Sequence, residues 1–175
     1  MHPADDNRRE YPLPDEAATR ALGALLATHL PPDPLPAAVI HLEGDLGAGK
    51  TTLVRGLLQS VDESITVKSP TFTLVEPYVI SGLHLYHFDF YRFNFPEEFL
   101  DAGLDEYFAN AGLCLVEWPA RAAPYVPPPD LVIRLVHAEK GRLASIEAAS
   151  ERGRQWLRRL PVSPDANFSS AAAPA

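Results

Sequence analysis

A glycine-rich segment, GDLGAGKT at residues 44–51, has the residue types and spacing of a phosphate-binding loop. It fits the pattern G-x-x-x-x-G-K-[S/T] at every specified position. Glycines let the backbone point its N–H groups at one anion, the lysine ammonium reaches the β- and γ-phosphates, and the threonine hydroxyl ligates Mg²⁺. The segment predicts a nucleotide site that includes Asp45, Leu46, Gly47, Ala48, Gly49, Lys50, Thr51 and Thr52. The alternative is a glycine turn with an incidental lysine. It is disfavoured because a strand-like run precedes the segment and a helical pattern follows it, which is the context of a phosphate-binding loop.

Two acidic residues are candidates for the rest of the chemistry, because nucleotide hydrolysis also needs a carboxylate near the metal and a group that orients water. Glu117 closes the apolar run LCLV, so we expect it at the carboxyl end of a buried strand, where open α/β sheets bind ligands. Asp89 lies among the aromatic rings of YHFDFY. The alternatives are an exposed strand-end acid for Glu117 and a structural ion pair with Arg92 for Asp89.

Histidine and cysteine offer no second site by their spacing. His84 and His87 lie three apart on an expected strand and therefore on opposite faces, which favours structural roles over a shared metal. The single cysteine, Cys114, excludes an internal disulfide and a multi-cysteine zinc site. We therefore expect no metal other than Mg²⁺.

The elements that must position these residues alternate between strand-like and helical patterns. Helices are expected at residues 15–29, 50–59, 96–108 and 151–160, and strands at 37–43, 72–78, 83–90, 113–117, 131–136 and 143–148. A strand, a glycine turn, a helix and further short apolar strands predict an α/β fold of the P-loop NTPase type, with a mainly parallel central sheet flanked by helices. Residues 1–12 are expected to be a flexible tail, 13–160 one domain, and 161–175 a disordered Ala/Ser/Pro-rich tail.

Composition limits the classes of function. The chain has 175 residues, a net charge of −8 and 46% hydrophobic residues, which is typical of one globular domain. The negative charge argues against a surface that grips a nucleic-acid backbone, since that requires excess Lys and Arg. We find no apolar run near the ~20 residues that span a bilayer, and no apolar signal core near the start. The expectation is a cytoplasmic protein without membrane contact.

Beyond the phosphate-binding loop, several blocks closely resemble the bacterial TsaE family. They appear in the family's order and spacing: PLPDEAAT from Pro12, KSPTFTLVEPY from Lys68, YHFDFYR from Tyr86, PEEFLDAGLDEYF from Pro96 and CLVEWP from Cys114. Proteins of this family are the P-loop ATPase subunit of the machinery that makes threonylcarbamoyladenosine in tRNA. These blocks are much more specific than a phosphate-binding loop, which many unrelated enzymes share.

The resemblance implies a role for each matching position. Thr51 and Glu117 would hold Mg²⁺, and Asp89 would position or activate the attacking water. The rest of the implied site comprises a switch-like loop of Ser69, Pro70 and Thr71, Trp118 beside the nucleotide, and Glu16 near the base. From the residues alone, we would favour an ordinary proline turn for the loop and a core or interface aromatic for Trp118.

The resemblance also implies a reaction and partners. The chain would hydrolyse ATP with Mg²⁺, using Lys50, Asp89 and Glu117, and would bind the transferase subunit pair that modifies the adenosine next to the anticodon. Contact with tRNA would then be indirect. Two alternatives remain: an adaptor that binds nucleotide without hydrolysis, and a small-molecule P-loop kinase. A kinase would be expected to carry an arginine-bearing lid, whereas AAPYVPPPD after Arg121 contains no arginine.

Overall fold

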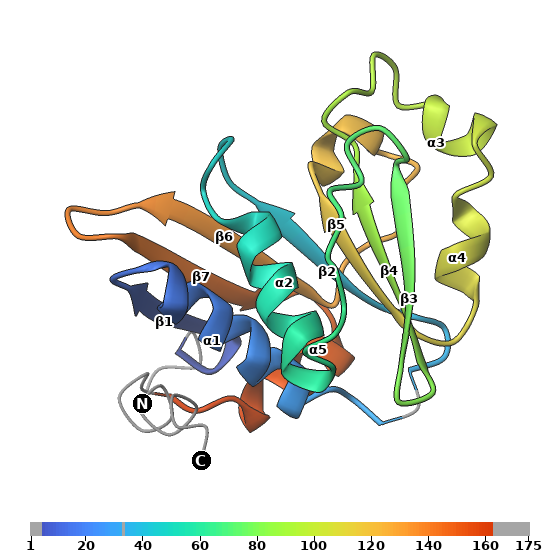
Figure 1. Cartoon of the computed structure of the whole chain (residues 1–175). Helices are drawn as coiled ribbons and strands as arrows, with labels where there is room; N and C mark the ends of the chain where they lie inside the picture. Colours follow the sequence, from blue (N-terminus) through green and yellow to red (C-terminus); the bar gives the residue numbers. More distant parts are fainter. Residues whose placement is uncertain (1–4, 33, 163–175) are drawn as a thin grey trace.

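A seven-stranded sheet forms the centre of the computed structural model, which describes residues 5–32 and 34–162 (Figure 1). The strand order is β1-β7-β6-β2-β5-β4-β3. Strands β6, β2, β5 and β4 are mutually parallel, and antiparallel strands flank them at both edges. The strands are β1 (Arg8–Leu13), β2 (Ala38–Glu43), β3 (Val75–Ile80), β4 (Leu83–Asp89), β5 (Leu113–Glu117), β6 (Leu131–His137) and β7 (Arg142–Ala148). The expected α/β fold with a mainly parallel central sheet flanked by helices is thus confirmed.

The helices cover the two faces of this sheet differently. They are α1 (Glu16–Thr28), α2 (Lys50–Val61), α3 (Glu98–Asp101), α4 (Asp105–Ala109) and α5 (Glu151–Arg159), with short 3-10 turns η1 (Asp5–Asn7) and η2 (Pro119–Ala122). An aliphatic core joins α1 and α2 to alternate residues of β2, β5 and β6, and α5 adds Trp156 and Leu157 to it. An aromatic core joins α3 and α4 to the other face of β4 and β5. The two faces of the sheet thus belong to separate cores, because successive side chains along a strand point to opposite faces.

Helices α1 and α2 lie side by side over the sheet (Figure 1) and approach each other closely at two glycines. A Cβ built on Gly56 would lie 2.2 Å from the carbonyl oxygen of Arg20, and one on Gly23 would lie 2.1 Å from that of Leu53. Both neighbours are backbone atoms, which cannot move without shifting a helix. This contact sets the position of α2, and α2 carries Lys50 and Thr51 at its start.

Replacement of Gly56 by alanine is therefore expected to destabilise the fold. The added methyl group overlaps the α1 backbone, and overpacking of this kind costs about 1–3 kcal/mol. For a chain of this size each kcal/mol lowers Tm by about 2–4 °C. Calorimetric or circular-dichroism melting of Gly56→Ala measures the loss. Ser60→Ala on the same helix should melt within about a degree of wild type, and an unchanged Gly56→Ala curve would show that the helices separate freely.

Three expected elements differ from the structure. Residues 1–12 were expected to be a flexible tail, but Arg8–Leu13 forms β1, because it pairs with β7 and buries Tyr11 and Leu13. The expected helix at 96–108 divides into α3 and α4 at Gly103, whose φ is 66°. The strand expected from residue 72 begins at Val75, since Leu74 has a φ of 68° and closes a turn onto Pro70.

Other expectations fall close to the observed bounds or outside the described residues. The helix expected at 15–29 is α1, capped by the Asp15 side chain, which accepts a hydrogen bond from Ala18 N at 2.8 Å. The strand expected at 113–117 coincides with β5. From residue 163 onward, the expected C-terminal tail lies outside the described residues. Among the described helices, none has the length and apolar character needed to cross a membrane.

Candidate nucleotide-binding site

The loop at residues 44–49 joins the carboxyl end of β2 to the first residue of α2. Gly49 is the N-cap of α2 with a φ of 106°, a conformation that suits glycine, and no side chain caps the helix. The N–H groups of the first helical turn have no partner within the helix, so they and the helix dipole favour an anion at this end. The backbone here thus has the shape of the anion cradle that the glycine spacing predicts, and the binding of an anion stays a prediction.

Lys50 is held inside this cradle and is only 5% exposed. Its Nζ donates hydrogen bonds to the carbonyls of Gly44 and Asp45, the latter at 3.0 Å, and lies 4.4 Å from the centre of the Trp118 ring. Burial lowers the pKa of Lys50, while the nearby carboxylates of Glu117, Asp89 and Asp45 act to raise it. The ammonium is thus positioned among acids and loop carbonyls, at the place where a phosphate group would enter.

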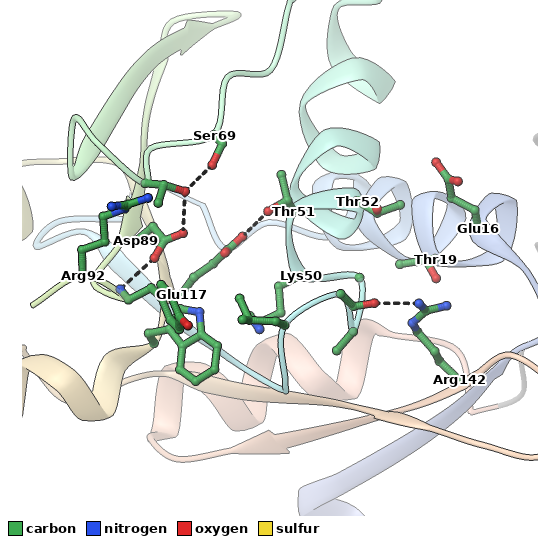
Figure 2. Close-up of a pocket in the computed structure, with 17 residues that line it drawn as sticks. Glu16, Thr19, Lys50, Thr51, Thr52, Ser69, Asp89, Arg92, Glu117 and Arg142 are labelled. Atoms are coloured by element: carbon green, nitrogen blue, oxygen red, sulfur yellow. Dashed lines mark hydrogen bonds between the residues drawn. The ribbon is translucent and has the colours of Figure 1, made fainter.

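Thr51 and Glu117 meet across the site from α2 and β5 (Figure 2). The Thr51 hydroxyl donates a hydrogen bond to Glu117 Oε1 at 2.9 Å. Glu117 is 3% exposed, which rules out the alternative of a solvent-exposed strand-end acid. Its Oε1 also contacts Nε2 of the buried His87 at 3.1 Å. His84, in contrast, is exposed, so the expected opposite faces are confirmed.

Asp89 lies on β4 beside Glu117, to which its backbone is paired in register. Oδ1 accepts a hydrogen bond from Tyr91 N at 2.9 Å, and Oδ2 accepts one from the Thr71 hydroxyl at 3.5 Å. Burial raises the pKa of Asp89, the Tyr91 N–H opposes that rise, and the charge of Glu117 adds to it. No ion pair joins it to Arg92 within residues 5–32 and 34–162. The Arg92 guanidinium lies over the Phe72 ring at 4.2 Å instead.

The segment at residues 69–74 is connected to Asp89 from above (Figure 2). The hydroxyls of Ser69 and Thr71 share a hydrogen bond of 2.6 Å, and the Thr71 hydroxyl also donates to Asp89 Oδ2. Leu74 N donates to Pro70 O at 2.8 Å, and Asp89 N donates to Leu74 O at 3.1 Å. The turn therefore contacts Asp89 through both a side chain and the backbone.

These groups surround one cavity of about 390 Å³, which is within the usual range for small-molecule sites. It is lined by Glu16, Thr19, Leu46, Gly47, Ala48, Gly49, Lys50, Thr51, Thr52, Ser69, Thr71, Asp89, Tyr91, Arg92, Glu117, Trp118 and Arg142. Of the residues expected at the site, Asp45 and Pro70 do not line it. Asp45 contributes its carbonyl to Lys50, and Pro70 is buried under the turn.

Trp118 follows Glu117 with a left-handed backbone, at φ 57° and ψ 48°. A bulky residue rarely takes this conformation, and such outliers cluster at functional sites. The turn aims the half-buried indole into the cavity, over Lys50 and 5.1 Å from the Tyr91 ring. Trp118 therefore lines the cavity and also packs against the aromatic core.

The end of the cavity away from Asp89 contains residues that the sequence reasoning missed (Figure 2). Arg142, the first residue of β7, donates from Nη2 to the carbonyl of Gly47 at 2.7 Å. Thr19 lies on α1, one turn beyond Glu16, whose carboxylate pairs with Arg20 at 2.6 Å. No motif marks Thr19 or Arg142, because they reach the loop through the packing of α1 and β7.

The donor set at the Glu117 end fits a small hard cation. Thr51 and Glu117 present oxygen atoms within hydrogen-bond distance of each other, and Mg²⁺ prefers oxygen ligands and keeps several waters. Among the described residues no group of three or more His, Cys, Asp or Glu side chains could hold a metal ion. A site of this kind therefore suits a cation that also takes ligands from phosphates and water, and does not suit a cation held by protein alone.

Known proteins are similar to this chain in both sequence and fold. The TsaE family model, described as threonylcarbamoyl adenosine biosynthesis protein TsaE, matches residues 13–144. A tRNA threonylcarbamoyladenosine biosynthesis protein TsaE from Haemophilus influenzae is 40% identical over 121 residues, covering 69% of this chain and 77% of that protein. One of the same name from Nostoc sp. is 39% identical over 133 residues, covering 74% and 78%. The crystal structure of Bacillus subtilis YdiB superposes with a TM-score of 0.67 at 32% identity, covering 87% of this chain and 93% of that one.

Proposed function

Because this chain belongs to the TsaE family of threonylcarbamoyl adenosine biosynthesis proteins, we propose that it binds ATP with Mg²⁺ and hydrolyses it in support of tRNA threonylcarbamoylation. The observation that carries the proposal is the meeting of Thr51 and Glu117 beside Lys50 in one cavity, with Asp89 on the adjacent strand. A strand-end acid and a loop threonine at 2.9 Å are what a metal-dependent P-loop ATPase requires.

The residues at the two ends of the cavity support one orientation of the nucleotide. Lys50 and the N–H groups of residues 47–52 bind the β- and γ-phosphates, so the terminal phosphate points toward Glu117 and Asp89. The nucleoside then extends toward Glu16, Thr19 and Arg142, which line the opposite end. Arg142 is anchored to the loop through Gly47, and therefore its guanidinium is in place before the ligand enters.

Hydrolysis requires charge stabilisation and a water in line with the terminal phosphate. Mg²⁺ bound at Thr51 and Glu117 would supply a positive charge on the phosphate oxygens. Lys50 stabilises the charge that develops on the same oxygens, and Asp89 accepts a hydrogen bond from the attacking water. Trp118, Ser69 and Thr71 line the cavity beside these groups. The overall reaction is ATP + H₂O → ADP + phosphate.

The partners in this proposal are the transferase subunit pair of the threonylcarbamoyladenosine machinery, and tRNA is reached through them. The net charge of −8 supports indirect contact, since a surface that grips tRNA carries excess Lys and Arg. The relatives' names place them in tRNA threonylcarbamoyladenosine biosynthesis, a process that fits the cytoplasm.

One incubation separates this function from its alternatives. ATP labelled on its terminal phosphate is mixed with the chain, with and without the transferase pair and with candidate small-molecule acceptors. We expect the label to appear only as inorganic phosphate, faster when the pair is present. Label on a small molecule would identify a kinase, and no release even with the pair would identify a non-hydrolysing adaptor. The absence of arginine from AAPYVPPPD after Arg121 argues against a kinase lid there.

A further inference from the structure

A buried histidine lies directly behind the carboxylate that would bind the metal. His87 on β4 is 0% exposed, and its Nε2 is 3.1 Å from Glu117 Oε1. It does not line the cavity, so it meets Glu117 from the core side while Thr51 meets the same oxygen from α2. No feature of the sequence around His87 predicted this contact, which joins residues 30 apart in the chain.

The sheet register fixes this arrangement. On β4, His87 and Asp89 are two residues apart and share a face, and they pair in register with Leu115 and Glu117 of β5. The same face carries the aliphatic core formed by Leu85, Leu113 and Leu115. The imidazole is therefore held between apolar side chains and one carboxylate, and it cannot turn to a different partner without opening the core.

The hydrogen-bonding capacity of the pair specifies what each atom does. A Glu117 carboxylate that binds a metal only accepts hydrogen bonds, so in that state Nε2 carries the proton and donates it to Oε1. The other ring nitrogen, Nδ1, is buried and has no hydrogen-bond partner among residues 5–32 and 34–162. Both hydrogen bonds described for the Glu117 carboxylate thus fall on Oε1, which leaves Oε2 for a ligand in the cavity.

We propose that His87 is a positioning residue that holds the Glu117 carboxylate in the orientation required for metal binding, through the bond from Nε2–H to Oε1. The inference rests on the proposed function, because it concerns the same Mg²⁺ site. Partners behind a metal ligand fix its orientation, and their loss typically lowers metal affinity about 10–100-fold. A histidine retained only for packing would leave Mg²⁺ dependence unchanged once the protein is folded.

Calorimetric binding of ADP, in excess EDTA and then with increasing Mg²⁺, tests the proposal without relying on hydrolysis. For His87→Leu we expect at least a tenfold rise in the Mg²⁺ concentration that gives half of the metal-dependent gain in affinity. Affinity in EDTA should stay within about twofold of wild type, because the Lys50 cradle is intact. His84→Leu, on the exposed face of the same strand, is the matched control and should behave as wild type.

A second pair of variants keeps the proposal falsifiable if His87→Leu does not fold. Glutamine places its amide nitrogen near the position of Nε2, and asparagine places its own near Nδ1. We therefore expect His87→Gln to retain the Mg²⁺ dependence of wild type and His87→Asn to lose it. Equal behaviour of the two, or an unchanged Mg²⁺ requirement in a folded His87→Leu, overturns the positioning role. If wild type itself binds ADP without any effect of Mg²⁺, the metal site of the proposed function fails first.

Discussion

Lys50→Ala is expected to weaken ATP and ADP binding on the order of 100-fold, since hydrogen bonds between charged groups contribute about 1.5–3 kcal/mol. The ammonium is 5% exposed and lies within the loop, so alanine removes the cation that the loop itself holds at the phosphate position. The carboxylates of Glu117 and Asp89 then repel the incoming phosphates more strongly, because the Lys50 charge that faces them is lost. Calorimetry with each nucleotide measures the loss directly.

The chain offers a matched control for this substitution. It has three lysines, and Lys140 is exposed in the turn between β6 and β7, away from the cavity. Lys140→Ala removes the same charge from the protein and should leave both affinities within about twofold. Comparable losses in the two variants would mean that net charge, and not the loop geometry, determines nucleotide binding.

Glu117→Gln is expected to lower ATP hydrolysis about 100-fold or more while ATP binding changes only a few-fold. Glutamine keeps the size of the side chain and can still accept the Thr51 hydrogen bond, but it loses the charge that would hold the metal. The folded state should not suffer, because a buried carboxylate is replaced by a neutral amide. Steady-state phosphate release with the transferase pair, set against calorimetric affinity, separates the two quantities.

Glu43→Gln is the control for Glu117→Gln. Glu43 also ends a parallel strand, β2, but it pairs with Arg134 at 2.8 Å and does not line the cavity. Its hydrolysis rate should equal that of wild type. A Glu117→Gln variant that hydrolyses ATP normally would show that another group holds the metal, and Asp89→Asn would then be the variant to measure.

The parts of the fold that were predicted correctly are those whose residues carry local signals. The run AVIHLE, the glycines and the apolar face of α2 specify strand, turn and helix in consecutive residues. Asp15 caps α1 within its own first turn. In contrast, β1 is specified by residues about 135 positions away, because Arg8–Leu13 becomes a strand only when it pairs with β7. Its polar sequence and Pro12 resemble a tail, and an edge strand tolerates both.

The same distinction between local signals and distant contacts applies to the residues of the site. Lys50, Thr51, Asp89 and Glu117 could be identified because a loop motif and the carboxyl ends of parallel strands meet at one edge of the sheet. Arg142 and His87 could not, since each reaches the site through a contact between distant segments and has no characteristic neighbours in the sequence. Spacing did place His84 and His87 on opposite faces, but only the register of β4 against β5 reveals that the inner one meets Glu117.

The bonds from Lys50 to the Gly44 and Asp45 carbonyls have a consequence for which anions the loop accepts. A ligand must replace interactions that the loop already makes with itself, each contributing about 0.5–1.5 kcal/mol or more when charged. An anion that offers one oxygen merely exchanges one acceptor for another and gains little. A polyphosphate offers several oxygens to the ammonium and to the N–H groups of α2 at once, so its gain exceeds the exchange. Under the proposed function, this exchange favours a polyphosphate over an anion that offers the loop a single oxygen.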